Sequence, residues 1–130
     1  MATTPRTSAA GHTLPGSQLR RVTEHIQAHL DQDLTLAHLG AVVYMSPYHF
    51  ARRFQHSTGL APHRFVVQQR IARARAFLAT QEQSVAQISR LVGFRTPSHF
   101  PTVFRRVTGL TPGTYRTAAL RADRPGRQGG

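Results

Sequence analysis

Apolar residues recur three and four positions apart along most of the chain, which is the spacing of a helix with one buried face. The first such stripe consists of Leu19, Val22, Ile26 and Leu30. The same spacing continues to about Leu120, and no segment keeps the strict apolar and polar alternation of a half-buried strand. The pattern therefore predicts an all-α protein.

Turn-forming residues divide this pattern into seven helices. They are expected over about 17–30, from near 35, over 47–58, over 62–79, from 84, from 97 and over 112–120. In the second helix, Leu36, Leu39 and Val43 are expected to face inward. The fifth helix should begin at a capping box formed by Ser84 and Gln87.

The segment 46–62 returns fifty positions later as 96–112. Both copies have Pro, His and two Phe at matching positions, and both close with Thr-Gly-Leu, one variable residue and Pro. Ser46 and Thr96 are of the type that caps a helix start, and Pro47 and Pro97 suit the first helical position. A repeat of this length predicts one structural unit that is used twice.

A short helix and a tight turn precede each copy, with Met45 and Phe94 as the apolar residues that fill the turns. This arrangement is typical of a helix-turn-helix, in which the second helix enters the DNA major groove. Gly40 and Ser89 hold matching positions where a small side chain allows close helix packing. We expect the Ser89 hydroxyl to bond back to the Val85 carbonyl.

The net charge of the chain indicates which class of partner it attracts. The 130 residues include 17 basic residues, all of them Arg, against five acids, for a formal net charge of +12. Such a chain is drawn to polyanions. A coding bias toward Arg explains the missing Lys but not the shortage of acids.

The sequence has few or none of the residues that several classes of function require. Without Cys there is no disulfide, no Cys-ligated zinc and no thiol nucleophile. Five acids offer little for acid–base catalysis, so we expect no enzyme and no cofactor. His25 and His29 have a spacing that can hold zinc, but no third ligand is evident and no metal site is expected. No secretory signal or membrane-spanning run is present, so a cytoplasmic, nucleoid-associated protein without membrane contact is expected.

The expected organisation has five parts. They are a disordered arm (1–16), a first helix-turn-helix subdomain (17–61), a linker helix (62–80), a second such subdomain (81–121) and a disordered tail (122–130).

The chain resembles the AraC/XylS family of bacterial transcription regulators from about Leu19 to Arg116. Its first motif is matched by residues 34–40 and its linker helix by Pro62, Arg70-Ile71, Ala74-Arg75 and Leu78. The second-half signature is matched by Gly93-Phe94, His99-Phe100, Phe104-Arg105-Arg106, Gly109-Leu110-Thr111-Pro112 and Tyr115-Arg116. The resemblance implies two helix-turn-helix subdomains joined by a rigid helix. It also implies that one asymmetric unit binds two successive major-groove segments. Because a rigid helix over 62–79 joins two similar units, we expect the two repeat helices to lie roughly parallel and ~34 Å apart, one turn of DNA.

In proteins like this, early outward positions of each repeat helix read bases. They correspond to Tyr48, Ala51 and Arg52 in the first copy, and to Ser98, Pro101 and Thr102 in the second. The Arg52 fork suits the O6 and N7 atoms of guanine, with a phosphate contact or a solvated charge as the alternative.

The second copy departs from the family pattern. The family usually has a long polar or basic residue where Thr102 stands, and Pro101 removes an amide donor. A helix tolerates Pro101 only if it begins late, near Ser98. The second half is therefore expected to grip phosphates more than to read bases.

Further residues are expected to contact phosphates, with a solvated face as the alternative for each arginine and packing beside the Phe residues as the alternative for the two histidines. They are Ser46, His49, Arg53, Arg95, Thr96, His99, Arg105, Arg106 and Arg116.

The leading interpretation is a sequence-specific, double-stranded DNA-binding transcription regulator. The alternative is a basic helical protein-interaction module that binds an acidic partner. The resemblance adds RNA polymerase as a candidate partner, and an effector-binding domain N-terminal to this region, for which the chain has no room. A stand-alone protein and a fragment of a longer regulator both stay open.

Overall fold

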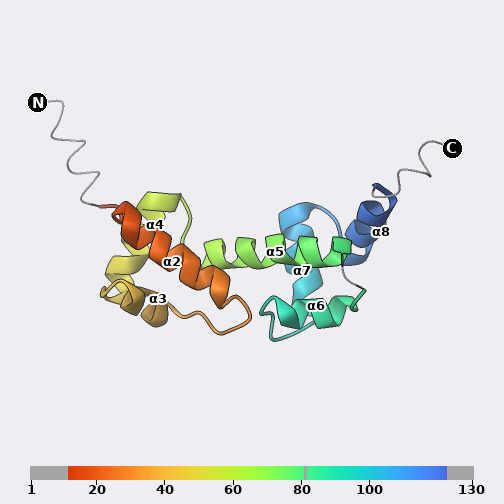
Figure 1. Cartoon of the computed structure of the whole chain (residues 1–130), viewed down its shortest axis with the longest axis horizontal. Helices are drawn as coiled ribbons and strands as arrows, with labels where there is room; N and C mark the ends of the chain where they lie inside the picture. Colours follow the sequence, from red (N-terminus) through yellow and green to blue (C-terminus); the bar gives the residue numbers. More distant parts are fainter. Residues whose placement is uncertain (1–11, 81, 123–130) are drawn as a thin grey trace, which may run out of the picture. The chain divides into compact units, whose positions relative to one another are not determined.

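The computed structural model describes residues 12–80 and 82–122, which contain seven helices and no strand (Figure 1). The helices are α2 (Gly16–Ala28), α3 (Leu36–Val42), α4 (Pro47–Thr58), α5 (Pro62–Thr80), α6 (Val85–Leu91), α7 (His99–Thr108) and α8 (Pro112–Ala122). The predicted all-α class and the seven helices are confirmed. Within the described ranges, no helix is both long enough and apolar enough to cross a membrane.

The chain folds as two compact units, the first ending at Val67 and the second beginning at Gln68. Helix α5 belongs to both, because it begins in the first unit and continues in the second. Val66 is buried in the core of the first unit, whereas Ile71 and Leu78 are buried farther along the same helix. The segment expected to act as a linker therefore also supplies core residues.

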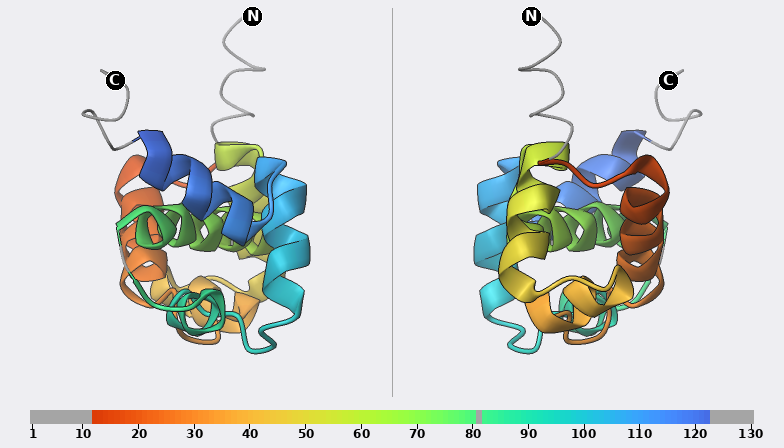
Figure 2. Two further views of the ribbon diagram at one scale, coloured as in Figure 1. Left: turned by 90° about the vertical axis from the view of Figure 1, so that its right-hand side faces the viewer. Right: turned by 90° about the vertical axis from the view of Figure 1, so that its left-hand side faces the viewer.

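The first unit is built around α4. Helix α3 contacts both α4 and α2, and Figures 1 and 2 show it below α4. The rings of Phe50 and Phe54, both fully buried, lie 5.4 Å apart, and Phe65 meets Phe54 edge-on at 5.1 Å. The buried core residues are Leu14, Val22, Ile26, Leu30, Leu39, Val43, Phe50, Phe54 and Val66.

The second unit repeats this core around α7. Phe100 and Phe104 are fully buried with ring centres 5.5 Å apart. Phe94, from the turn before α7, meets Phe100 at 5.1 Å, and Tyr115 of α8 meets Phe104 at 5.6 Å. Each repeat helix therefore places its own pair of Phe in a separate small core.

The segment just before α2 corrects the expected arm. Leu14 is buried in the first core, and its N–H donates to Ser57 Oγ at 2.8 Å. The rings of His12 and His56 stack at 5.5 Å. Residues 12–16 thus belong to the first unit, since burial of Leu14 and its hydrogen bond hold them there. Residues 1–11 and 123–130 lie outside the described residues.

Helix α3 and its turn depend on a close backbone approach. A methyl group at Gly40 would lie only 2.6 Å from the Met45 carbonyl oxygen. The small residue at position 40 is therefore needed for the close approach of the turn, and not for packing against a second helix. Leu36, expected inside, is 41% exposed, and Leu34 packs against the core instead.

The turn before α4 contains a strained residue. Tyr44 has φ of 60° and is 88% exposed. A side chain at positive φ is uncommon outside Gly, Asn and Asp. The matching residue of the second turn is Gly93, with φ of 101°. The backbone requires the left-handed region at this point in both copies, and only the second copy meets it with Gly.

The two repeat helices end in the same way. Gly59 and Gly109 adopt φ of 82° and 86°, and each donates its N–H to the carbonyl four residues back at 2.8 Å. Thr58 and Thr108 accept the N–H of the residue two positions later, both at 3.1 Å. Both repeat helices therefore end at a left-handed glycine.

The starts of the two repeat helices differ. Phe50 donates to the Ser46 carbonyl at 2.9 Å, which is α-helical bonding. In the second copy, His99 and Phe100 donate to carbonyls only three residues back, those of Thr96 and Pro97. Helix α7 therefore begins at His99, and the expected Thr96 cap with Pro97 as the first helical residue is wrong.

Pro101 explains the late start. A helix beginning at Pro97 would need an N–H from residue 101 to that carbonyl, and proline has none. Helix α7 begins at His99, so Pro101 lies in its first turn. The late start expected from Pro101 is confirmed.

Two expectations for α6 have opposite outcomes. The capping box of Ser84 and Gln87 is confirmed, with both reciprocal hydrogen bonds formed. Ser89 is fully buried, but its hydroxyl donates to the Ala86 carbonyl at 2.7 Å and not to Val85. In a helix, carbonyls three and four residues back are both within reach of a Ser or Thr hydroxyl, so spacing does not decide between them.

Replacing either inner Phe by Ala should lower the free energy of unfolding by ~3–5 kcal/mol, as the loss of a large buried ring does. Phe54→Ala and Phe104→Ala test the two cores separately by chemical denaturation. Tyr48→Ala, an exposed ring on the same helix as Phe54, is the control and should cost less than ~1 kcal/mol. A loss below ~1 kcal/mol for Phe54→Ala would contradict the assigned buried face.

Gly40→Ala should destabilise the chain by ~1–3 kcal/mol, because the added methyl group forces backbone apart at the turn. Gly113→Ala is the matched control, since a methyl group there meets no atom within 4 Å. At that helical position we expect a gain of ~0.4–1 kcal/mol. Equal thermal melts for the two variants would show that the approach to Met45 is not tight.

Candidate nucleic-acid interface

The start of α4 is fixed by its cap. The His49 N–H donates to Ser46 Oγ at 3.2 Å, and the Ser46 Oγ also lies 3.1 Å from His49 Nδ1. Pro47 occupies the first helical position. Two of the predicted phosphate contacts, Ser46 and His49, are thus brought together and exposed at the N-terminus of this helix.

The outward face of α4 carries the predicted base-reading residues of the first copy. Tyr48 is 66% exposed, Arg52 is exposed and Ala51 is half-buried. Arg52 Nη1 donates to the Tyr48 hydroxyl at 3.1 Å, and the guanidinium carbon lies 5.6 Å from the centre of the Tyr48 ring. This pairing was not anticipated from the sequence, although the i, i+4 spacing permits it.

The corresponding surface of the second copy presents shorter side chains. Ser98 and Thr102 are exposed, and Pro101 between them is half-buried. Ser98 precedes the first helical residue and makes no capping hydrogen bond. Thr96 is exposed ahead of it, and the exposed His99 lies edge-on to Phe94 at 6.1 Å.

The remaining predicted phosphate contacts lie in different settings. Arg105 and Arg106 are exposed in the last turn of α7. Arg53 on α4 is half-buried and Arg95 before α7 is exposed, and each already takes part in an interaction within the chain.

Arg116 has a structural role that was not expected. Its Nε donates to the Leu78 carbonyl at 3.2 Å, and its Nη2 donates to the Gln83 carbonyl at 2.7 Å. The half-buried guanidinium therefore ties α8 to the C-terminal end of α5 and to the following loop. Two of its five N–H donors serve backbone carbonyls inside the second unit, so Arg116 has a structural role and is not among the phosphate contacts proposed below.

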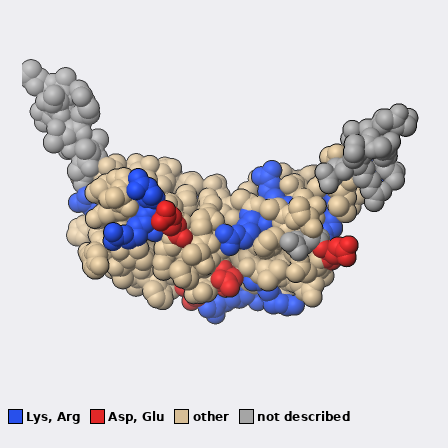
Figure 3. Space-filling view, in the orientation of Figure 1, with Lys and Arg blue, Asp and Glu red and all other residues tan. Residues whose placement is uncertain are grey.

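Charge is distributed unequally between the two units, and Figure 3 shows basic side chains on both. The described part of the second unit has nine arginines and one acid, for a formal charge of +8, against five arginines and three acids, or +2, in the first. The nine are Arg70, Arg73, Arg75, Arg90, Arg95, Arg105, Arg106, Arg116 and Arg121. Electrostatic attraction to a polyanion is therefore stronger in the second unit.

Three histidines of the first unit, His25, His29 and His38, lie near one another. The rings of His25 and His29 stack at 4.2 Å, and His29 Nδ1 lies 2.8 Å from the His25 carbonyl. Burial lowers the pKa of His25, and the nearby His29 and His38 lower it further. Residues 12–80 and 82–122 contain no group of three or more His, Asp or Glu placed to hold a metal ion.

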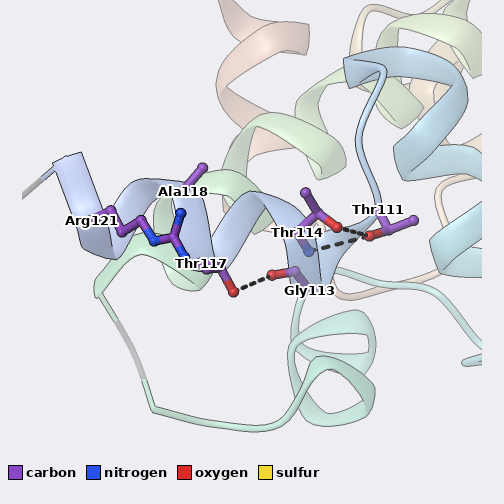
Figure 4. Close-up of a pocket in the computed structure, with 6 residues that line it drawn as sticks. All are labelled: Thr111, Gly113, Thr114, Thr117, Ala118 and Arg121. Carbon is purple, nitrogen blue, oxygen red and sulfur yellow. Dashed lines mark hydrogen bonds between the residues drawn. The ribbon is translucent and has the colours of Figure 1, made fainter.

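A surface depression lies along one side of α8 (Figure 4). The Thr114 N–H donates to Thr111 Oγ1 at 3.2 Å, and the Thr117 hydroxyl donates to the Gly113 carbonyl at 3.1 Å. Its lining comes from the single segment 111–121, and these hydroxyls already serve the helix. The depression is therefore explained by the local structure of α8 and its cap.

Comparison with known proteins agrees with this arrangement. A family model described as a helix-turn-helix domain matches residues 39–118. The regulatory protein PocR of Salmonella typhimurium is 36% identical over 117 residues, which cover 86% of this chain and 39% of that protein. The chain thus spans well under half the length of this curated relative.

Solved structures match over most of the chain. The DNA-binding domain of AdpA, solved in complex with a target DNA, is 38% identical with a TM-score of 0.75, covering 82% of this chain and 96% of that one. An AraC-type regulator from Chromobacterium violaceum has a TM-score of 0.76 over 84% of this chain and 95% of that one, and at 24% identity it supports the fold alone. With two helix-turn-helix units and a family model matched from residue 39 to residue 118, the chain belongs to the AraC-type helix-turn-helix family.

Proposed function

We propose that the chain is the sequence-specific, double-stranded DNA-binding part of a transcription regulator. Helices α4 and α7 are its two recognition helices, and each enters one of two successive major-groove segments. The observation that carries this proposal is the outward face of α4, where Tyr48 and Arg52 project from a helix whose opposite face is fully buried. A guanidinium fork held clear of the protein surface has the shape and donors to recognise guanine.

The two halves contribute differently. The first half reads bases through Arg52, with Tyr48 beside it and the Ala51 methyl group available to a thymine methyl. The second half adds affinity more than specificity, because Ser98 and Thr102 reach only a short distance from the backbone. Its charge of +8 over the described residues supports a phosphate-gripping role.

The phosphate contacts we propose lie on or beside the two recognition helices, and all of them are exposed except the half-buried Arg53. They are Ser46, His49, Arg53, Arg95, Thr96, His99, Arg105 and Arg106. Each of the arginines adds to the counterion release that drives binding, so they contribute to all DNA sequences alike.

We also propose that the chain acts by binding rather than by catalysis, and in the cytoplasm, where bacterial DNA lies. RNA polymerase as a contact during activation, and an effector-binding domain N-terminal to this region, complete the proposal. Support for both comes from the relatives, which are named as regulators and are much longer than this chain.

Binding to duplex DNA should depend steeply on salt. If six or more phosphates are contacted, affinity should fall by ~10³ or more between low and moderate salt, because each contact releases a condensed counterion. Fluorescence anisotropy with a random-sequence duplex, repeated over a series of salt concentrations, measures the slope. A flat titration would contradict the proposal and favour an acidic protein partner.

Variants of the two recognition helices should separate reading from gripping. Arg52→Ala should relax preference at one or two base pairs and cost ~1–3 kcal/mol on the best site. Arg105→Ala removes the same kind of side chain from α7, and should weaken all sequences alike and lower the salt slope by about one. Thr102→Ala should leave sequence preference nearly unchanged.

The comparison is made by selecting bound sequences from a randomised duplex pool, for the wild type and for each of the three variants. Loss of a second half-site preference with Thr102→Ala, together with an unchanged first half-site in Arg52→Ala, would reverse the assigned roles.

A further inference from the structure

Tyr48 and Arg52 form a pair on the surface of α4 before any ligand is bound. They lie four residues apart, which places them on the same side of the helix. The Arg52 Nη1 donates to the Tyr48 hydroxyl at 3.1 Å. Both side chains are exposed, so burial does not hold them together.

We propose that Tyr48 is a positioning residue for Arg52, and that the two act as one reading unit rather than as two separate base contacts. The phenol holds the guanidinium in the orientation in which Arg52 recognises its base pair. This inference rests on the DNA-binding function proposed above, and it deepens that function by naming what sets specificity in the first half.

Restricting Arg52 in advance changes the cost of recognition. A free Arg side chain samples many rotamers, and fixing it at an interface opposes binding. The Tyr48 ring has only two side-chain torsions and loses little entropy by comparison. A guanidinium already bonded to the phenol therefore arrives at the groove with part of this cost removed.

The pairing leaves Arg52 able to read a base. The guanidinium has five N–H donors, and one bond to Tyr48 leaves four. A bidentate contact to guanine O6 and N7 needs two of them. The Tyr48 hydroxyl, as the acceptor in this bond, keeps its own proton free to donate.

The hydroxyl contributes more to the pairing than the ring does. The guanidinium carbon is 5.6 Å from the ring centre, close to the outer limit of about 6 Å for a useful cation–π contact. The hydrogen bond, at 3.1 Å, is within its ordinary range. Tyr48→Phe, which deletes the hydroxyl and keeps the ring, is therefore the informative substitution.

The second copy has no counterpart of this pair. Ser98 and Thr102 occupy the positions that match Tyr48 and Arg52 in the repeat. Neither residue has a guanidinium or a ring, so the proposed unit is confined to the first half.

The test is a double-mutant cycle with the 130-residue chain and the duplex that the wild type selects from a randomised pool. Tyr48→Phe should reduce discrimination at the base pair read by Arg52 by about 3- to 10-fold, the worth of one hydrogen bond. Affinity for random-sequence DNA, to which phosphate contacts contribute most, should change less than discrimination does. In the Arg52→Ala background, the same change should alter discrimination by less than about 2-fold, because the residue it positions is gone.

Tyr44→Phe is the matched control. It removes the same hydroxyl from a tyrosine that is more exposed than Tyr48 and lies just before the same helix. Discrimination should not change in this variant.

A second measurement needs no DNA. The nitrogen-15 relaxation of the Arg52 Nε–H group in the free protein should show a more restricted side chain in wild type than in Tyr48→Phe. Equal mobility in the two proteins would overturn the inference.

Equal losses for Tyr48→Phe in both backgrounds would also overturn it, and would make Tyr48 a direct base contact. That result leaves the proposed DNA-binding function standing. Failure of the wild-type chain to select any sequence would instead reject the proposed function, and this inference with it.

Discussion

Burial of two Phe side chains, four residues apart, fixes the orientation of each recognition helix. Phe50 and Phe54 on α4, like Phe100 and Phe104 on α7, are fully buried. Two buried residues at this spacing set the rotation of a helix about its own axis, so the opposite side must face solvent. The position of Arg52 on the outside of the fold is a consequence of this constraint.

The features that could be predicted from the sequence are those set by neighbours in the chain. The bounds of 47–58 and the capping box at Ser84 depend on residues within one turn of helix, and both were predicted correctly. The exposure of Leu36 and the partner of the Ser89 hydroxyl depend on packing and rotamers, which periodicity does not encode. Arg116 bonds to carbonyls 38 and 33 residues earlier, and no local pattern points to them.

The candidate site could be predicted from the sequence only as far as local spacing determines it. Helical spacing identified the outward positions of α4, and the missing amide of Pro101 indicated the late start of α7. The hydrogen bond between Tyr48 and Arg52 was not predicted, since two exposed side chains on one face can each point elsewhere. Local sequence thus identified which residues of α4 face outward, whereas their mutual geometry required the structure.

The late start of α7 bears on how such a protein acquires a new target. Both recognition helices end at the same kind of glycine stop, so their outward residues look interchangeable when the two repeats are aligned with each other. Transplanting Tyr and Arg onto positions 98 and 102 would nevertheless place the first of them before the helix begins, in a turn whose hydrogen bonds reach three residues back instead of four. Under the proposed function, retargeting the second half, in the laboratory or in evolution, therefore involves Pro101 as well as the reading side chains.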